Sequence, residues 1–105
     1  MDNIFQNIWD RILALIPDKP LSDIDMAIEF DKLAEGTNLN WRSSVVDFLT
    51  LLKIDASKEN REALALELGV TVGQPGSAER NEALRKAVFN KIALNGGNIP
   101  PILSK

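Results

Sequence analysis

Five stretches of this chain carry apolar side chains at helical spacing, and each is bounded by proline, glycine, serine or asparagine. Apolar residues three and four positions apart fall on one side of an α-helix, whereas a half-buried β-strand alternates apolar and polar residues. No such alternation runs through the sequence. We therefore predict an all-α fold, one compact five-helix domain over residues 1–105 with short connections and an extended C-terminal tail. The predicted helices span about residues 3–16, 23–35, 41–53, 58–68 and 78–94.

Residues that cap helices mark where these stretches begin and end. Serine and asparagine accept hydrogen bonds from the free amides of a first turn, and glycine adopts the left-handed conformation that ends a last turn. Asp2 can cap the first helix and Pro17 ends it. Gly69 followed by apolar Val70 has the form of a Schellman ending. The expected N-caps of the second to fifth helices are Ser22, Asn40, Ser57 and Ser77.

The first helix is more apolar than a peripheral helix needs to be. Its large apolar side chains fall within about half of the helical wheel, opposite a polar side that carries Asp10 and Arg11. If the other helices already close a core, part of this apolar side stays exposed, and such a face marks a partner site. The alternative is that the side simply completes the core. The candidate partner-binding anchors are Phe5, Trp9, Ile12 and Ile16.

Three residue types are missing, because the sequence has no cysteine, no histidine and no tyrosine. Their absence excludes thiol nucleophiles, imidazole bases, phenolic acids, disulfides and the usual zinc ligands. The sequence also lacks the glycine-rich patterns of phosphate-binding loops and the aspartate pattern of a calcium loop. We therefore predict no enzymatic activity, no catalytic residue, no metal ion and no cofactor.

Acidic residues gather in the second helix, where Asp25 and Glu29 lie four positions apart and share a face. Such a pair could hold a hard cation weakly, or it is an ordinary solvated face. The formal net charge of the chain is −3. Since nucleic acids and anionic membranes attract basic surfaces, this charge argues against both as partners. The sequence shows neither a basic signal segment nor a continuous apolar span, so we expect no membrane insertion and a cytoplasmic location.

Trp41 and Arg42 stand where the third helix is expected to begin. Arg42 places a positive charge at the positive end of the helix dipole, which is locally unfavourable. A residue placed against local preference is often held by a specific partner. We expect that partner to be an intramolecular carboxylate, Asp25, Glu29 or Asp47, and the alternative is a ligand. Trp41 and Arg42 therefore join the candidate partner-binding residues.

Several segments together resemble the bacterial and phage domain-of-unknown-function family numbered 3597: Ile4-Phe5, Trp41–Leu49, Asp55–Ser57, Leu64–Gly69 and Lys91–Pro100. The most specific of them is the tryptophan-arginine segment with its two serines, two valines and aspartate. The resemblance implies a five-helix domain with a flexible segment between the first two helices. It implies no activity, cofactor or catalytic residue. This chain departs from the family in having only a short connector there, Pro17 to Leu21.

The missing catalytic residue types and the apolar first helix favour a non-catalytic protein-interaction or adaptor module of a bacterial or phage system. Its partner would be another protein or a second copy of the chain. Some relatives lie beside cell-wall-binding modules, so the resemblance also implies a cell-envelope or peptidoglycan-associated domain as an alternative. A structural subunit of a virion or of an injection-type assembly is a further alternative.

Overall fold

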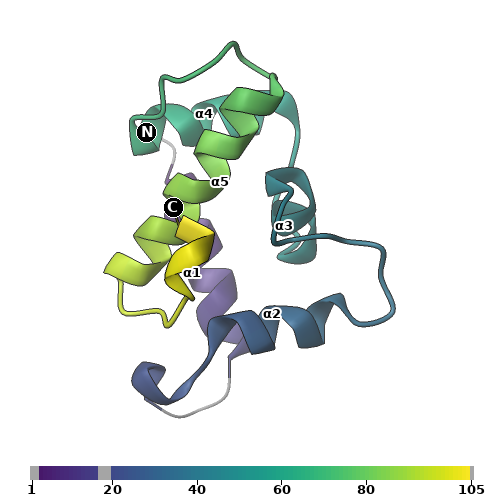
Figure 1. The fold of residues 1–105 in the computed structure, drawn as a ribbon, viewed down its shortest axis with the longest axis vertical. Coiled ribbons are helices and arrows are strands. Elements are labelled where there is room, and N and C mark those ends of the chain that lie inside the picture. Colours follow the sequence, from purple (N-terminus) through teal and green to yellow (C-terminus); the bar gives the residue numbers. More distant parts are fainter. Residues whose placement is uncertain (1–2, 17–19, 105) are drawn as a thin grey trace.

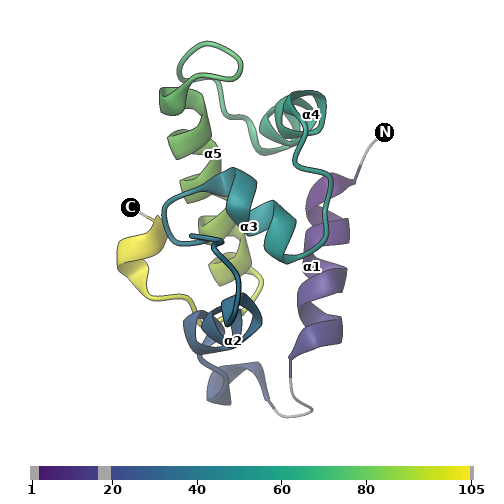
Figure 2. The same cartoon turned by 90° about the vertical axis from the view of Figure 1, so that its right-hand side faces the viewer.

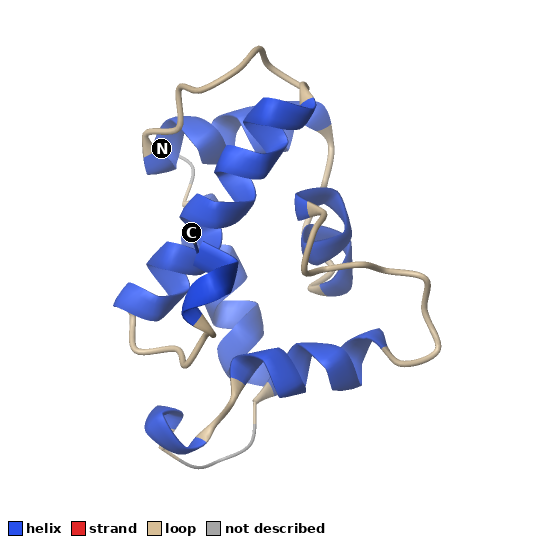
Figure 3. Ribbon diagram, in the orientation of Figure 1, coloured by secondary structure: helices blue, strands red, loops and turns tan. Residues whose placement is uncertain are grey.

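The computed structural model describes residues 3–16 and 20–104 of the chain. Asp2 and Pro17, the expected cap and stop of the first helix, and the rest of the connector at 18–19 lie outside these residues. Over the described residues the fold has five α-helices, two short 3-10 helices and no strand, which confirms the all-α prediction (Figure 3). In chain order the elements are α1 (Ile4–Leu15), η1 (Leu21–Asp23), α2 (Met26–Ala34), α3 (Val45–Leu51), α4 (Lys58–Leu68), α5 (Ala78–Leu94) and η2 (Pro101–Ser104).

The longest helix, α5, is the element around which the others are arranged. It contacts α3, α4 and η2, while α1 packs against α4 and α2 packs against α3. In Figure 1, α2 lies across the lower end of the molecule and α4 across the upper end. Figure 2 shows α1 and η2 on opposite sides of α5. Segments from both ends of the chain therefore flank the same central helix.

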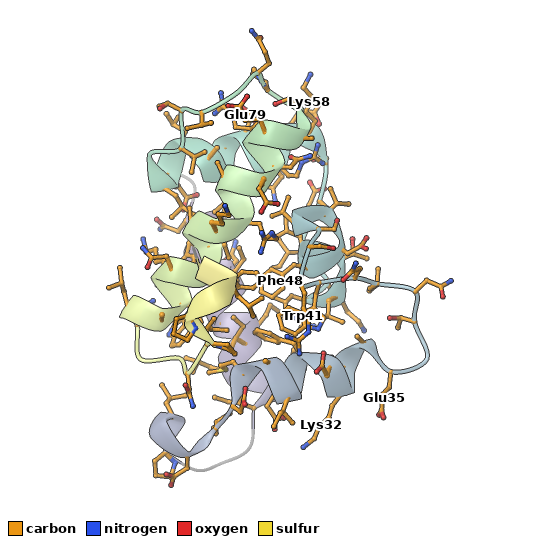
Figure 4. The ribbon with its side chains drawn as sticks, in the orientation of Figure 1. Lys32, Glu35, Trp41, Phe48, Lys58 and Glu79 are labelled. Atoms are coloured by element: carbon orange, nitrogen blue, oxygen red, sulfur yellow. The ribbon has the colours of Figure 1, made fainter. Side chains whose placement is uncertain are left out.

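Four aromatic rings form the centre of the core, where α2, α3 and α5 face one another. The Phe48 ring lies edge-on to Phe30 and Phe89, with ring centroids 5.2 and 4.9 Å apart. Trp41 completes the cluster, with its ring centroid 5.1 Å from that of Phe30 (Figure 4). Edge-to-face packing places the positive ring edge of one residue against the negative face of the next. Because these rings come from three helices and a turn, they join elements that the sequence separates.

The ends of α4 and α5 follow the capping signals of the sequence. The Ser57 and Ser77 hydroxyls each accept a hydrogen bond from the amide three residues later, as expected of N-caps. Gly69 has a left-handed φ of 72°, and the Val70 amide donates to the Ala65 carbonyl. This geometry confirms the predicted Schellman-type ending of α4.

The helices α2 and α3 begin three and four residues later than predicted, at positions 26 and 45 instead of 23 and 41. Ser22 lies inside η1, and the Asp25 carboxylate caps α2 instead. The Ser44 hydroxyl caps α3, while the Asn40 carbonyl accepts hydrogen bonds from a separate turn that precedes it. That turn contains Trp41, so the tryptophan reaches the core from outside the helix.

The expected extended tail is corrected over its last residues, because Pro101–Ser104 form η2 against α5. Ile99 and Leu103 are both buried in the common core. The tail also binds the start of α2, where the Met26 amide donates to the Asn98 carbonyl at 3.0 Å. The segment after α5 is therefore an integral layer of the domain.

Candidate functional site

The apolar side of α1 is divided between the core and the surface. Phe5 and Ile12 are buried, because this side of the helix packs against α4, and a partner cannot reach them in this structure. For these two candidate anchors the structure matches the alternative, in which the apolar side completes the core. Trp9 and Ile16 are half-buried at the edge of the core, and Leu13 is 43% exposed. The accessible part of α1 is thus narrower than the helical wheel suggests.

Trp9 and Leu13 of α1 and its C-cap residue Ile16 follow one another at helical spacing, and we call these three residues the α1 flank. Their spacing of four and three residues places the side chains next to one another along the helix. Leu13 is the most exposed of the three, although it is not among the predicted anchors. The wheel places Leu13 at the edge of the apolar half, and this position is the signal that could have identified it.

Glu67 of α4 holds the first turn of α1. Its carboxylate accepts hydrogen bonds from the Ile4 amide at 2.7 Å and from the Phe5 amide at 3.2 Å. The N-cap residue Asn3 makes no side-chain capping bond of its own. A carboxylate at this position also opposes the positive end of the helix dipole. Since Glu67 is more than sixty residues away in the sequence, no local capping pattern could reveal it.

Replacing Glu67 with alanine is expected to lower the free energy of unfolding by about 2 kcal/mol, because two amides lose a charged acceptor. Urea unfolding followed by circular dichroism would measure this loss. The matched control is Glu35→Ala, which removes an exposed carboxylate. An equal loss of stability in both variants would show that the Glu67 contact does not hold α1.

Two basic side chains also secure α1, one near its first turn and one further along the helix. The Arg11 guanidinium donates to the Leu52 carbonyl at 2.9 Å and ties α1 to the end of α3. On α5, the Lys91 ammonium lies 4.9 Å from the centroid of the Phe5 ring, within the range of a cation–π contact. The helix is therefore fixed to three neighbours along its length.

Trp41 and Arg42 share one carboxylate, that of Asp31 on α2. The Trp41 indole donates to Oδ1 at 3.0 Å, and the Arg42 guanidinium donates to Oδ2 at 2.8 Å. Arg42 also lies over the Trp41 ring at 4.6 Å. The expected intramolecular partner is thus present, but it is Asp31 and not one of the three acids considered from the sequence. Trp41 is 2% exposed, so as a predicted partner-binding residue it is inaccessible here.

The acidic pair on α2 is used inside the domain. Asp25 accepts hydrogen bonds from the amides of Ala27 and Ile28, and Glu29 forms an ion pair with Lys32. Within residues 3–16 and 20–104, no three acidic side chains come together in a way that could hold a metal ion. No helix in this part of the chain is both long and apolar enough to cross a membrane.

Arg85 is a buried charge that sequence reasoning missed. Its guanidinium pairs with Glu82 and donates to the Leu103 carbonyl at 3.4 Å, so it links α5 to η2. It also lies 5.9 Å from the centroid of the Phe89 ring. The available signal was its position four residues before Phe89, which places both on the buried side of α5.

The pKa of the Glu82 carboxyl lies below its ordinary value of 4.5, because Arg85 donates a hydrogen bond to it, although burial opposes the shift. A lowered pKa stabilises the folded state above the ordinary pKa, and this contribution is lost as the pH falls through the folded-state value. We therefore expect the stability of the native chain to fall more steeply below pH 4.5 than that of Glu82→Gln.

Urea unfolding at a series of pH values would measure both curves. Because the Glu82 side chain is 46% exposed, solvent screens the pair and the two curves should diverge only modestly. Parallel curves at acidic pH would contradict the assignment.

Among the hollows on the surface of the described residues, two lie between helices. The smaller, of about 250 Å3, lies between the start of α3 at Ser43 and Ser44 and the start of α5 at Asn81 and Glu82. The larger, of about 420 Å3, lies between the end of α4 and the last turns of α5. Sequence reasoning missed the larger one. Leu94 lines it and is 77% exposed, and a leucine outside the apolar side of a predicted helix is the signal that could have pointed to it.

Comparison with known proteins places the chain in a family. A family model described as "Domain of unknown function (DUF3597)" matches residues 4–100, from the first residue of α1 to the segment before η2. Neither the curated proteins nor the solved structures give a match. Because the family model covers nearly the whole chain, the protein belongs to the domain-of-unknown-function family DUF3597.

Proposed function

We propose that this domain is a non-catalytic protein-interaction module that binds its partner through the α1 flank. The observation that supports this proposal is the exposure of Leu13 between half-buried Trp9 and Ile16. Large apolar side chains at this spacing are the anchors with which helices dock against partner helices or grooves. Tryptophan is also among the residue types that contribute most to binding at interfaces.

The attachment of α1 to the domain supports the same proposal. Glu67 fixes the first turn of the helix, and Arg11 fixes the middle. The flank is therefore presented on a helix whose position is already set, so a partner loses little free energy in ordering it. The bacterial or phage setting and the cytoplasmic location expected from the sequence belong to this proposal.

The size of the α1 flank predicts a weak complex. A stable interface buries about 800 Å2 on each partner, and three side chains supply only part of that area. We therefore expect a transient complex in which Trp9 and Leu13 provide the apolar centre.

The test is a pair of matched leucine substitutions. Leu13→Glu places a charge in the centre of the α1 flank, whereas Leu66→Glu places the same charge on α4 at a leucine that is 85% exposed. The native chain and both variants are immobilised and exposed to extract from the source cells, and each retained protein is quantified. Sedimentation of the purified chains detects self-association. We expect the native chain to retain a partner protein or to form a dimer. Leu13→Glu should abolish this binding, and Leu66→Glu should preserve it.

Two outcomes would contradict the proposal. One is a partner retained equally by the native chain and both variants. The other is a native chain that sediments as a monomer and retains no protein that distinguishes Leu13→Glu from Leu66→Glu.

A further inference from the structure

The 420 Å3 groove between α4 and α5 is separate from the α1 flank, and none of the flank residues lines it. One wall is formed by Glu67 and Leu68 at the end of α4. The other is formed by Asn90, Lys91 and Leu94 on α5, with Asn95 at the end of the helix. The groove therefore combines apolar walls with polar groups, which is the usual make-up of a site that binds and orients a ligand.

Lys91 is the positive charge among the residues that line this groove. No described carboxylate lies within ion-pair distance of its ammonium group. The contact with the Phe5 ring holds the ammonium beside the first turn of α1. A cation–π contact leaves the hydrogen-bond donors of an ammonium free for another ligand. Lys91 is therefore placed to receive an anionic group.

Glu67 also lines the groove, but its carboxylate does not form an ion pair with Lys91. Its carboxylate is engaged by the two amides at the start of α1, at 2.7 and 3.2 Å. The positive end of the α1 dipole also offsets its charge. The groove thus offers a cation that pairs with no carboxylate of the described residues, next to a carboxylate that is already satisfied.

The remaining groups of the groove match a peptide backbone and an apolar side chain. The Asn90 and Asn95 side chains are exposed and make no hydrogen bond to another described residue. Each amide can donate to a peptide carbonyl and accept from a peptide amide. Leu68 and Leu94 provide apolar contact on opposite walls. Leu94, at 77% exposure, has more apolar surface to lose to a ligand than most leucines.

We propose that this groove binds the C-terminal end of a partner polypeptide whose last residue is apolar. The terminal carboxylate pairs with Lys91, the last apolar side chain lies between Leu68 and Leu94, and the asparagine amides bind the peptide backbone. A chain terminus joins a carboxylate and an apolar side chain within one residue, which fits a groove where the Lys91 ammonium lies near two leucines. An aspartate or glutamate side chain separates these two features.

The test titrates the full chain with a short uncharged synthetic peptide that ends in leucine, and it follows amide resonances by nuclear magnetic resonance. The probes are the free-acid peptide, the same peptide with an amidated terminus, and an amidated peptide that carries one internal aspartate. We expect the free acid to shift resonances of residues 67–68 and 87–95, and to bind at least about tenfold more tightly than the amidated form.

Matched lysine variants locate the anion. Lys91→Ala is expected to weaken binding of the free acid about tenfold, and Lys91→Arg is expected to retain most of it. The control is Lys86→Ala, which removes a lysine on α5 that lies outside the groove and beside Glu82. Leu94→Ser removes an exposed apolar wall without disturbing the core, and it should also weaken binding. Circular dichroism confirms that each variant is folded.

Three results would overturn the proposal: equal binding of the free acid and its amide, tighter binding of the aspartate peptide, or no shift at the groove at millimolar peptide. Equal effects of Lys91→Ala and Lys86→Ala would overturn it as well. None of these outcomes depends on Leu13, so they are distinguishable from a failure of the α1 flank.

Discussion

Phe48→Ala is expected to lower the free energy of unfolding by about 4 kcal/mol, the middle of the range for truncating a buried phenylalanine to alanine. Phe48 is fully buried and packs edge-to-face against Phe30 and Phe89, with Trp41 as a third ring neighbour. Alanine would remove these contacts and leave a cavity between α2, α3 and α5. Rings on three separate elements cannot all move inward to fill it, because each is held by its own backbone.

Urea unfolding followed by tryptophan fluorescence would measure this loss, since Trp41 reports on the same cluster. The control is Leu66→Ala, which truncates an exposed side chain on α4 and should change stability by less than about 0.5 kcal/mol. A loss below about 2 kcal/mol for Phe48→Ala would show that the cluster is not the centre of the core.

Removing residues 97–105 is expected to destabilise the domain by about 4 kcal/mol or more. Two buried apolar side chains, Ile99 and Leu103, leave the core, and each contributes about 1.5–3 kcal/mol. Met26 loses the carbonyl that binds its amide, and buried Arg85 loses the Leu103 carbonyl. Such a loss is comparable to the whole stability of many small domains, which is about 5–15 kcal/mol.

Thermal unfolding of the shortened chain would measure this effect. Leu103→Ala in the full chain provides an independent variant, because it truncates the buried side chain at the same contact and should reproduce part of the loss. Leu94→Ala is the control, as it removes an exposed leucine close to the same end of the chain. A shortened chain with the native melting temperature would contradict the role of the tail.

The sequence alone predicts where a helix begins when only one candidate N-cap residue is nearby. Ser57 and Ser77 are each followed by a helix at the predicted position, and Gly69 ends α4 as its conformation requires. In α2 and α3 two competent caps lie within four residues of each other, and local propensity does not choose between them. Contacts from distant segments do, such as the Asn98 carbonyl that binds the first amide of α2.

The candidate sites depended more strongly on contacts that a single sequence does not reveal. The helical wheel identified the apolar half of α1, but the packing of α1 against its neighbours decides that Phe5 is covered and Leu13 is not. The sequence predicted that Arg42 pairs with a carboxylate of the same chain, but it did not identify Asp31 as that carboxylate. The groove beside Lys91 exists because α4 and α5 end close together, a relation that no local pattern encodes.

The dependence of α1 on Glu67 has a consequence for synthesis on the ribosome. The first turn of α1 is synthesised before the carboxylate that completes it, which is 63 residues further along the chain. At about 5 to 20 residues per second, the nascent polypeptide waits roughly 3 to 13 s before that group is even translated. During this interval the apolar side of α1 lacks the contact with α4 that covers it in the folded domain. Chaperones that recognise short apolar stretches would therefore have several seconds in which to bind the nascent chain.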